Sequence, residues 1–115
     1  MEDFLFIFRM EITAGQQQPT AAQREESMKK WKGWLETLAA QKHLTNAGSR
    51  LKPEGKVVKP KSIVTDGPYI EMKGVIGGYS IIKAESLAQA TELAKDCPVF
   101  LIGGNVEVRE IMTMS

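Results

Sequence analysis

The sequence has few of the residues that form covalent cross-links or metal sites. Its 115 residues include one cysteine, Cys97, and one histidine, His43. A single cysteine cannot form a disulfide within the chain, and one cysteine with one histidine cannot supply the four ligands of a structural zinc. We therefore expect no disulfide framework, no metal and no other cofactor.

Long apolar runs and an excess of one charge are also missing. The apolar run at residues 4–8 follows Glu2 and Asp3 and is too short for a signal peptide or a membrane span. Fifteen basic and fourteen acidic residues give a net charge of +1. This balance argues against broad attraction to nucleic acid or an anionic membrane. We expect a cytoplasmic protein without nucleic-acid or membrane partners.

What the sequence does contain is enough apolar residues for one core. The composition is 43% hydrophobic and 25% charged, which is typical of globular domains. Folding of a chain of this length buries roughly two-thirds of its surface, enough for one core but not for two. We therefore predict a single domain over residues 1–115.

The first half has the patterns of a strand and a helix. Residues 4–11 alternate with apolar side chains on both parities, which is typical of a central strand. Thr20 and Gln23 have the spacing of a capping box, and a helix is expected from there to residue 42 or 43. Its apolar stripe comprises Met28, Trp31, Leu35 and Leu38.

The middle of the chain is basic and irregular. Residues 42–61 contain six cations and one anion, a net charge of +5, so the rest of the chain carries 1 − 5 = −4. Glycines and prolines break the segment into short extended pieces, of which Val57 and Val58 are the best strand candidate. A solvated hairpin or loop protected by lysines explains the charge. A nucleic-acid surface would need interleaved aromatic residues, which this segment lacks.

The second half repeats the strand and helix patterns. Residues 75–84 predict a buried strand, and residues 106–112 predict a last strand. Ser86 and Gln89 again have capping-box spacing. The stripe of this second helix comprises Leu87, Ala90, Ala94 and Cys97.

This order of elements predicts an α+β fold. An antiparallel sheet with both helices on one face, the ferredoxin-like βαββαβ arrangement, lets each helix bury its stripe. The other sheet face would still carry apolar residues such as Leu5 and Ile7. We expect a symmetric homodimer to cover them and to enclose a ligand cavity between the two sheets.

A specific resemblance supports this fold. Residues 66–79 read DGPYIEMKGVIGGY and resemble the signature of the DGPF branch of YCII-related proteins. The similarity covers most of the chain, including the tryptophan-bearing first helix and the GGNVEVR stretch at 103–109. It implies a dimeric α+β barrel in a superfamily that includes isomerases, monooxygenases and dehydrochlorinases. The family itself has no settled activity, and some DGPF proteins look linked to extracytoplasmic-function sigma factors.

The sequence departs from this family pattern at three positions. Tyr69 replaces the signature's phenylalanine, and Lys42 stands where the first helix of the family ends in glycine. A left-handed cap is not expected at Lys42, because a side chain is strained there. In the more distant YciI-like branch, a histidine on the first helix has been proposed to pair with an aspartate. Its place is Trp31 here, so this chain resembles a branch without that dyad.

The candidate catalytic residue is Asp66. At a cavity mouth it could act as a general base, with Tyr69 and Glu71 nearby as ligand-binding residues. The structural alternative is that its carboxylate accepts backbone amide protons in a turn built on Gly67 and Pro68.

The other candidates are two arginines and two aromatic residues. Arg9 and Arg109 are expected on neighbouring strands, where Glu11, Glu107 or an anionic ligand could pair with them. Trp31 and Tyr79 could line a ligand pocket; the alternative is that these aromatic residues belong to the core.

The predicted function is binding of a small, anionic organic molecule in the homodimer cavity. If a reaction follows, we expect cofactor-free acid/base chemistry of the isomerase or lyase type. Asp66 would be the base, and Arg9 or Arg109 would stabilise negative charge. The alternative is a non-catalytic regulatory or interaction protein that acts through its surface and is linked to sigma-factor-dependent transcription.

Overall fold

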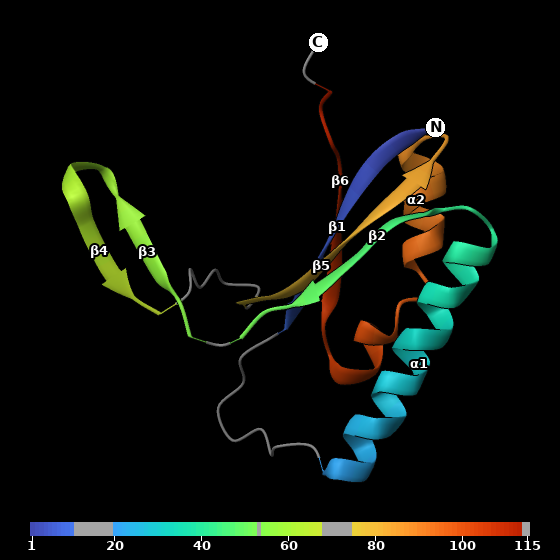
Figure 1. Ribbon diagram of the computed structural model, residues 1–115, viewed down its shortest axis with the longest axis horizontal. Coiled ribbons are helices and arrows are strands. Elements are labelled where there is room, and N and C mark those ends of the chain that lie inside the picture. The colour runs from blue at the N-terminus through green and yellow to red at the C-terminus, as the bar shows by residue number, and fades with distance from the viewer. Residues whose placement is uncertain (11–19, 53, 68–74, 114–115) are drawn as a thin grey trace.

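Four strands form one antiparallel sheet in the computed structural model, which describes residues 1–10, 20–52, 54–67 and 75–113 (Figure 1). The strand order is β2-β5-β1-β6, so β1 and β5 are central. Together with a helix after β1 and another after β5, this is the ferredoxin-like arrangement, and the predicted fold class is confirmed. The strands are β1 (Glu2–Met10), β2 (Leu44–Arg50), β5 (Val75–Ala84) and β6 (Asn105–Glu110).

Two capped helices connect these strands. In α1 (Ala21–Ala40), the Thr20 hydroxyl accepts a hydrogen bond from the Gln23 amide at 3.1 Å, and the Gln23 side chain accepts one from the Thr20 amide at 2.9 Å. In α2 (Leu87–Ala94), the Ser86 hydroxyl accepts from the Gln89 amide. Both predicted caps are therefore confirmed. The described helices include none that is long and apolar enough to cross a membrane.

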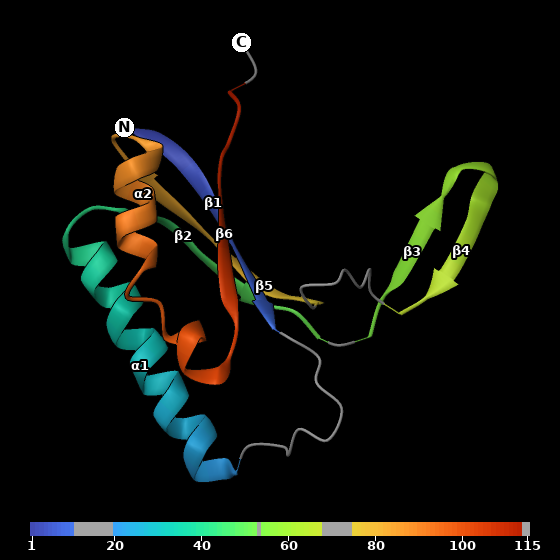
Figure 2. The same ribbon diagram turned by 180° about the vertical axis from the view of Figure 1, so that it is seen from behind.

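The hydrophobic core lies between one face of the sheet and both helices (Figure 2). Phe4 and Phe6 of β1 are fully buried, and Trp34 and Leu38 of α1 pack against them. α2 adds Ala90 and Ala94, while a short 3-10 helix, η2 (Pro98–Ile102), adds Val99. The helices therefore cover a single sheet face, as the sequence predicts.

The two helical stripes are shorter than predicted. Met28 in α1 is 61% exposed, and Leu87 in α2 is 54% exposed. Both residues lie toward the start of their helices, where the apolar spacing continues without a partner in the core. The expectation that they are buried is therefore wrong.

The end of α1 also differs from the prediction. Lys42 has a φ of 63°, so it adopts the left-handed conformation that we did not expect for a residue with a side chain. Two backbone hydrogen bonds hold it there: the Lys42 amide donates to the Ala39 carbonyl at 3.0 Å, and the His43 amide donates to the Leu38 carbonyl at 2.8 Å. This bonding pattern is a Schellman motif. The motif outweighs the conformational cost of the lysine side chain.

The basic middle segment divides into two parts. β2 joins the main sheet, whereas β3 (Lys56–Lys59), η1 (Pro60–Ser62) and β4 (Ile63–Asp66) form a separate hairpin. We call this hairpin, residues 56–66, the arm. Figure 1 shows that it projects from the rest of the protein. The radius of gyration is 15.6 Å, larger than the roughly 13 Å of a compact domain of this length.

Candidate functional site

The sheet face opposite the helices, which we call the open face, carries apolar and charged residues in register. Ile7 of β1 lies between Tyr79 of β5 and Glu107 of β6. Leu5 of β1 lies between Ile81 of β5 and Arg109 of β6 in the same way. Neighbouring strands are about 4.8 Å apart, so each row is continuous. The open face therefore places a half-buried apolar patch directly beside a charged strip.

Three charged residues form the centre of that strip. The Arg9 guanidinium lies 3.0 Å from Glu107 Oε1, and the Arg109 guanidinium lies 3.3 Å from Glu107 Oε2. One carboxylate thus holds two arginines, each through a different oxygen. We call these three residues the Arg–Glu–Arg cluster. Exposure of the side chains increases across it, from 11% for Arg9 to 36% for Glu107 and 69% for Arg109.

Glu107 is the ionised centre of the cluster. The hydrogen bond from Arg9, supported by that from Arg109, holds the pKa of Glu107 below its usual value, and slight desolvation opposes this. Glu107 is therefore ionised at neutral pH, and each of its two oxygens accepts from one arginine. Arg109 has five N–H donors and uses one of them on Glu107. Its exposed guanidinium can bind a further anion.

A β-bulge between β1 and β5 lies beside the buried member of the cluster. The register between β1 and β5 shifts between Phe8 and Arg9, so that Phe8 lies opposite Gly78 and Arg9 lies opposite Ile76. Gly77 is left without an opposite residue, as is typical of a bulge. Phe8 and Arg9 are both buried, although they are adjacent in β1.

The structure brings three of the predicted site residues together and separates a fourth. Arg9, Tyr79 and Arg109 lie on neighbouring strands of the open face. Trp31, by contrast, packs edge-on against Phe8, with ring centroids 4.8 Å apart, on the side of the helices. Trp31 is therefore part of the packing around the core, as the alternative interpretation proposed.

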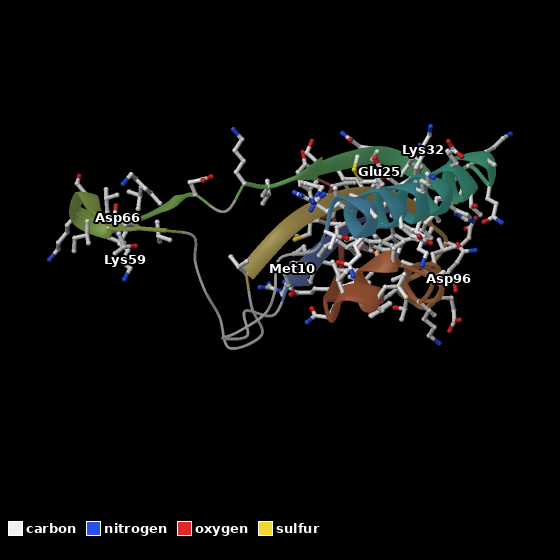
Figure 3. The ribbon with its side chains drawn as sticks, turned by 90° about the horizontal axis from the view of Figure 1, so that it is seen from below. Met10, Glu25, Lys32, Lys59, Asp66 and Asp96 are labelled. Carbon is white, nitrogen blue, oxygen red and sulfur yellow. The ribbon has the colours of Figure 1, made fainter. Side chains whose placement is uncertain are left out.

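Asp66 lies far from these residues. It ends β4 in the arm, where its carboxylate accepts a hydrogen bond from Lys56 Nζ at 2.6 Å and its side chain is 93% exposed. Figure 3 shows Asp66 well separated from Met10, the sequence neighbour of Arg9. The predicted Tyr69 and Glu71 lie outside the described residues. Within one chain, the described structure thus separates the proposed base from the arginines.

Away from the cluster, described residues line two hollows. One, of about 570 Å³, lies at the base of the arm beside the Lys56–Asp66 pair. The other, of about 530 Å³, lies between α1 and η2, and both Trp34 and Cys97 line it. Burial raises the pKa of the Cys97 thiol to about 12, so it is protonated at neutral pH and is a poor nucleophile. Neither hollow adjoins the Arg–Glu–Arg cluster.

Sequence reasoning missed the central position of Glu107. The sequence offers three partners for the arginines: Glu11, Glu107 or an anionic ligand. The ion pair with Glu107 is confirmed. Glu11 lies outside the described residues. A usable signal was present, since Glu107 and Arg109 are two positions apart and therefore share one face of a strand.

Comparison with known proteins adds a family match. The model of the YCII-related domain family matches residues 8–115. None of the curated proteins matches the sequence. Among solved structures, a 5-chloro-2-hydroxyhydroquinone dehydrochlorinase from Burkholderia phenoliruptrix AC1100, in complex with 2,5-dihydroxybenzoquinone, is similar with 18% sequence identity and a TM-score of 0.44. The alignment covers 95% of this chain and 93% of that one.

Proposed function

Because the chain belongs to the YCII-related domain family, we propose that it is a cytoplasmic homodimer that binds a small, anionic organic molecule between its two open faces. The observation that carries this proposal is the combination of an apolar patch with the Arg–Glu–Arg cluster on the sheet face that neither helix covers. An organic anion needs both, because its charge pairs with an arginine while its carbon skeleton leaves water.

The apolar part of the open face supports the dimer. Leu5, Ile7, Tyr79 and Ile81 are only half-buried, and both helices lie on the opposite side of the sheet. A second copy related by a twofold axis would present the same residues and cover them symmetrically. The space between the two faces would then be lined by both copies.

The cluster supports the preference for an anion. Arg109 is the exposed cation and contacts the ligand, whereas Arg9 is buried and fixes Glu107 in place. Glu107 in turn orients Arg109 and limits the rotamers that it can adopt. An arginine held in this way loses less conformational freedom when it binds a carboxylate than a free side chain would.

Binding is the function that we propose, because the described site offers no proton-transfer group beside the arginines. Glu107 is engaged by both arginines and stays ionised. Asp66 is paired with Lys56 in the arm. Acid/base chemistry with Asp66 as the base would require a second copy to bring it to the cluster.

Titration with benzoate tests the proposal, since benzoate carries one carboxylate on an apolar ring. Two-dimensional NMR should show saturable shifts at Ile7, Tyr79 and Arg109, and benzyl alcohol, the uncharged analogue, should bind at least about tenfold more weakly. Arg109→Gln should weaken benzoate binding by about tenfold, because it removes a charge-assisted hydrogen bond.

Arg50→Gln is the matched control. Arg50 is an exposed arginine of the same sheet, on β2 and opposite Gly78, so its loss should leave benzoate binding unchanged. Equal weakening by both variants would show a general charge effect and would contradict the proposed site. Saturable shifts confined to Trp34 and Thr37, in the hollow between α1 and η2, would place the ligand elsewhere.

A further inference from the structure

The arm exposes apolar side chains that a short hairpin does not normally leave in water. Val58 is 72% exposed, Ile63 is 53% exposed and Val64 is 52% exposed. The two strands pair over only four residues each. A two-stranded hairpin of this kind is marginally stable at best without a packing partner.

The turn of the arm adds a conformational cost. Lys61 and Ser62 have φ values of 68° and 61°, which favour glycine or asparagine. The side-chain bonds recorded for the arm join its own two strands: Lys56 with Asp66, and the Thr65 hydroxyl with the Val57 carbonyl. These contacts are exposed or local and do not cover the apolar residues.

We propose that the arm packs against a second copy of this chain. The inference rests on the proposed homodimer and specifies a second contact within it. The first argument is charge complementarity. The arm, residues 56–66, contains three lysines and one aspartate, a net charge of +2, so the rest of the chain carries 1 − 2 = −1. Carboxylates of another copy can pair with these lysines.

The described carboxylates have a place where an arm could meet them. Glu2 and Glu110 lie at the same end of the main sheet, since Glu2 is opposite Ala84 and Glu110 is opposite Phe4. Asp3, which is opposite Lys83, and Glu85, which follows Ala84, belong to the same end of the sheet. The N-terminus lies at this end of the sheet, and Figure 1 shows the arm well away from it. Within one chain these opposite charges lie apart, and a second copy can bring them together.

The position of the arm is continuous with the proposed dimer interface. It is inserted between β2 and β5, which are neighbours in the main sheet. Seen from below in Figure 3, the arm extends sideways at the level of β2. A copy seated on the open face therefore lies beside the arm, and Val58 and Val64, which are opposite each other in the hairpin, offer it one apolar surface.

Paired variants test this contact by sedimentation velocity. The double variant Val58→Lys, Val64→Lys should raise the dimer dissociation constant by at least about tenfold, because it places charges in an apolar contact. Leu101→Lys is the matched control, since Leu101 is 65% exposed but belongs to η2 on the side of the helices. The control should change the dissociation constant by less than about twofold.

Ile7→Lys separates the arm from the open face. It should dissociate the dimer on its own. If Ile7→Lys dissociates the protein and the arm double variant does not, the arm proposal is overturned and the homodimer stands. If the wild-type chain is a monomer, both proposals fail.

Hydrogen exchange of the arm amides provides a direct readout. Amides that bond across β3 and β4 should be protected in the wild-type dimer and should lose at least about tenfold of that protection in the Ile7→Lys monomer. Equal protection in both would show that the arm is stable without a partner and would overturn the proposal. So would protection that appears only when duplex DNA is added, since the arm would then bind nucleic acid.

Discussion

The main sheet and the arm are both antiparallel, but they keep their apolar residues in very different surroundings. In the main sheet, Phe4 and Phe6 are fully buried beneath two helices. In the arm, Val58 is 72% exposed. The main sheet is thus stabilised by its own chain, whereas the arm has strand-forming residues without a core. Both regions contain residues that favour strands. They differ in whether other parts of the same chain bury the apolar side chains.

The largest expected effect comes from a glycine that sits where two strands of the main sheet meet. A Cβ on Gly48 would lie 1.7 Å from the Tyr79 carbonyl oxygen, and its φ of +72° disfavours a side chain. Gly48→Ala should therefore lower the free energy of unfolding by more than about 4 kcal/mol. Urea denaturation measures the loss, and an insoluble or unfolded product agrees with it.

Gly67→Ala is the matched change beside the arm. Gly67 has a similar φ of +82°, but an added Cβ would meet nothing within 4 Å. The cost should be about 1–2 kcal/mol and local, so the urea midpoint of the main sheet should barely move. An equal loss of unfolding free energy in Gly48→Ala and Gly67→Ala would contradict the claim that the main sheet is tightly packed and the arm is not.

Truncation of apolar side chains sharpens the same comparison. Phe6→Ala removes a fully buried ring and should cost about 3–5 kcal/mol. Val64→Ala shortens a side chain that is 52% exposed and should cost less than about 0.5 kcal/mol in the monomeric Ile7→Lys background. Urea denaturation compares them, and a large loss for Val64→Ala in the monomer would show that the arm packs against its own chain.

The left-handed residues allow a gain in stability. Lys42→Gly relieves the strain of the Schellman motif and should raise the free energy of unfolding by about 1 kcal/mol. Lys61→Gly makes the same change in the arm, where it should increase the exchange protection of the hairpin without shifting the global transition. No gain from Lys42→Gly would mean that the lysine side chain stabilises the helix end in another way.

The smallest effect is the acid dependence of the Arg–Glu–Arg cluster. The folded-state pKa of Glu107 lies below its unfolded value of 4.5, so its contribution is fully present above pH 4.5 and is lost as pH falls through the folded-state value. Because the side chain is 36% exposed, solvent screening limits the effect to about 0.5 kcal/mol.

Glu107→Gln provides the test of that assignment. The difference in unfolding free energy between wild type and variant should shrink as the pH is lowered below 4.5. A constant difference over this range would show that Glu107 does not titrate as an ion-paired carboxylate.

The sequence predicts local features of this fold best. Both caps depend on side chains three residues apart, and the predicted strand at residues 75–84 coincides with β5. Such features need only neighbouring residues. The exposed Met28 and Leu87 show the limit of the same reasoning, because a correct spacing does not reveal where the core ends.

The long-range contacts of the site could not be predicted from the sequence. Arg9 and Glu107 are 98 positions apart, and their contact depends on the register between β1 and β6. The sequence left open whether the basic segment is a hairpin or a loop, because Lys61 and Ser62, rather than an Asn-Gly pair, occupy the left-handed positions of the turn. Strand register and the burial of a segment by the rest of the fold are tertiary properties, and local sequence patterns do not determine them.

Sedimentation velocity of the wild-type chain at micromolar concentration tests the central claim most directly. If the open face is an interface, the protein sediments as a species of twice the chain mass of 12.7 kDa, and Ile7→Lys returns it to the single-chain mass. A wild-type protein that sediments at 12.7 kDa over this range would contradict the account, because the open face would then have no second copy to cover it.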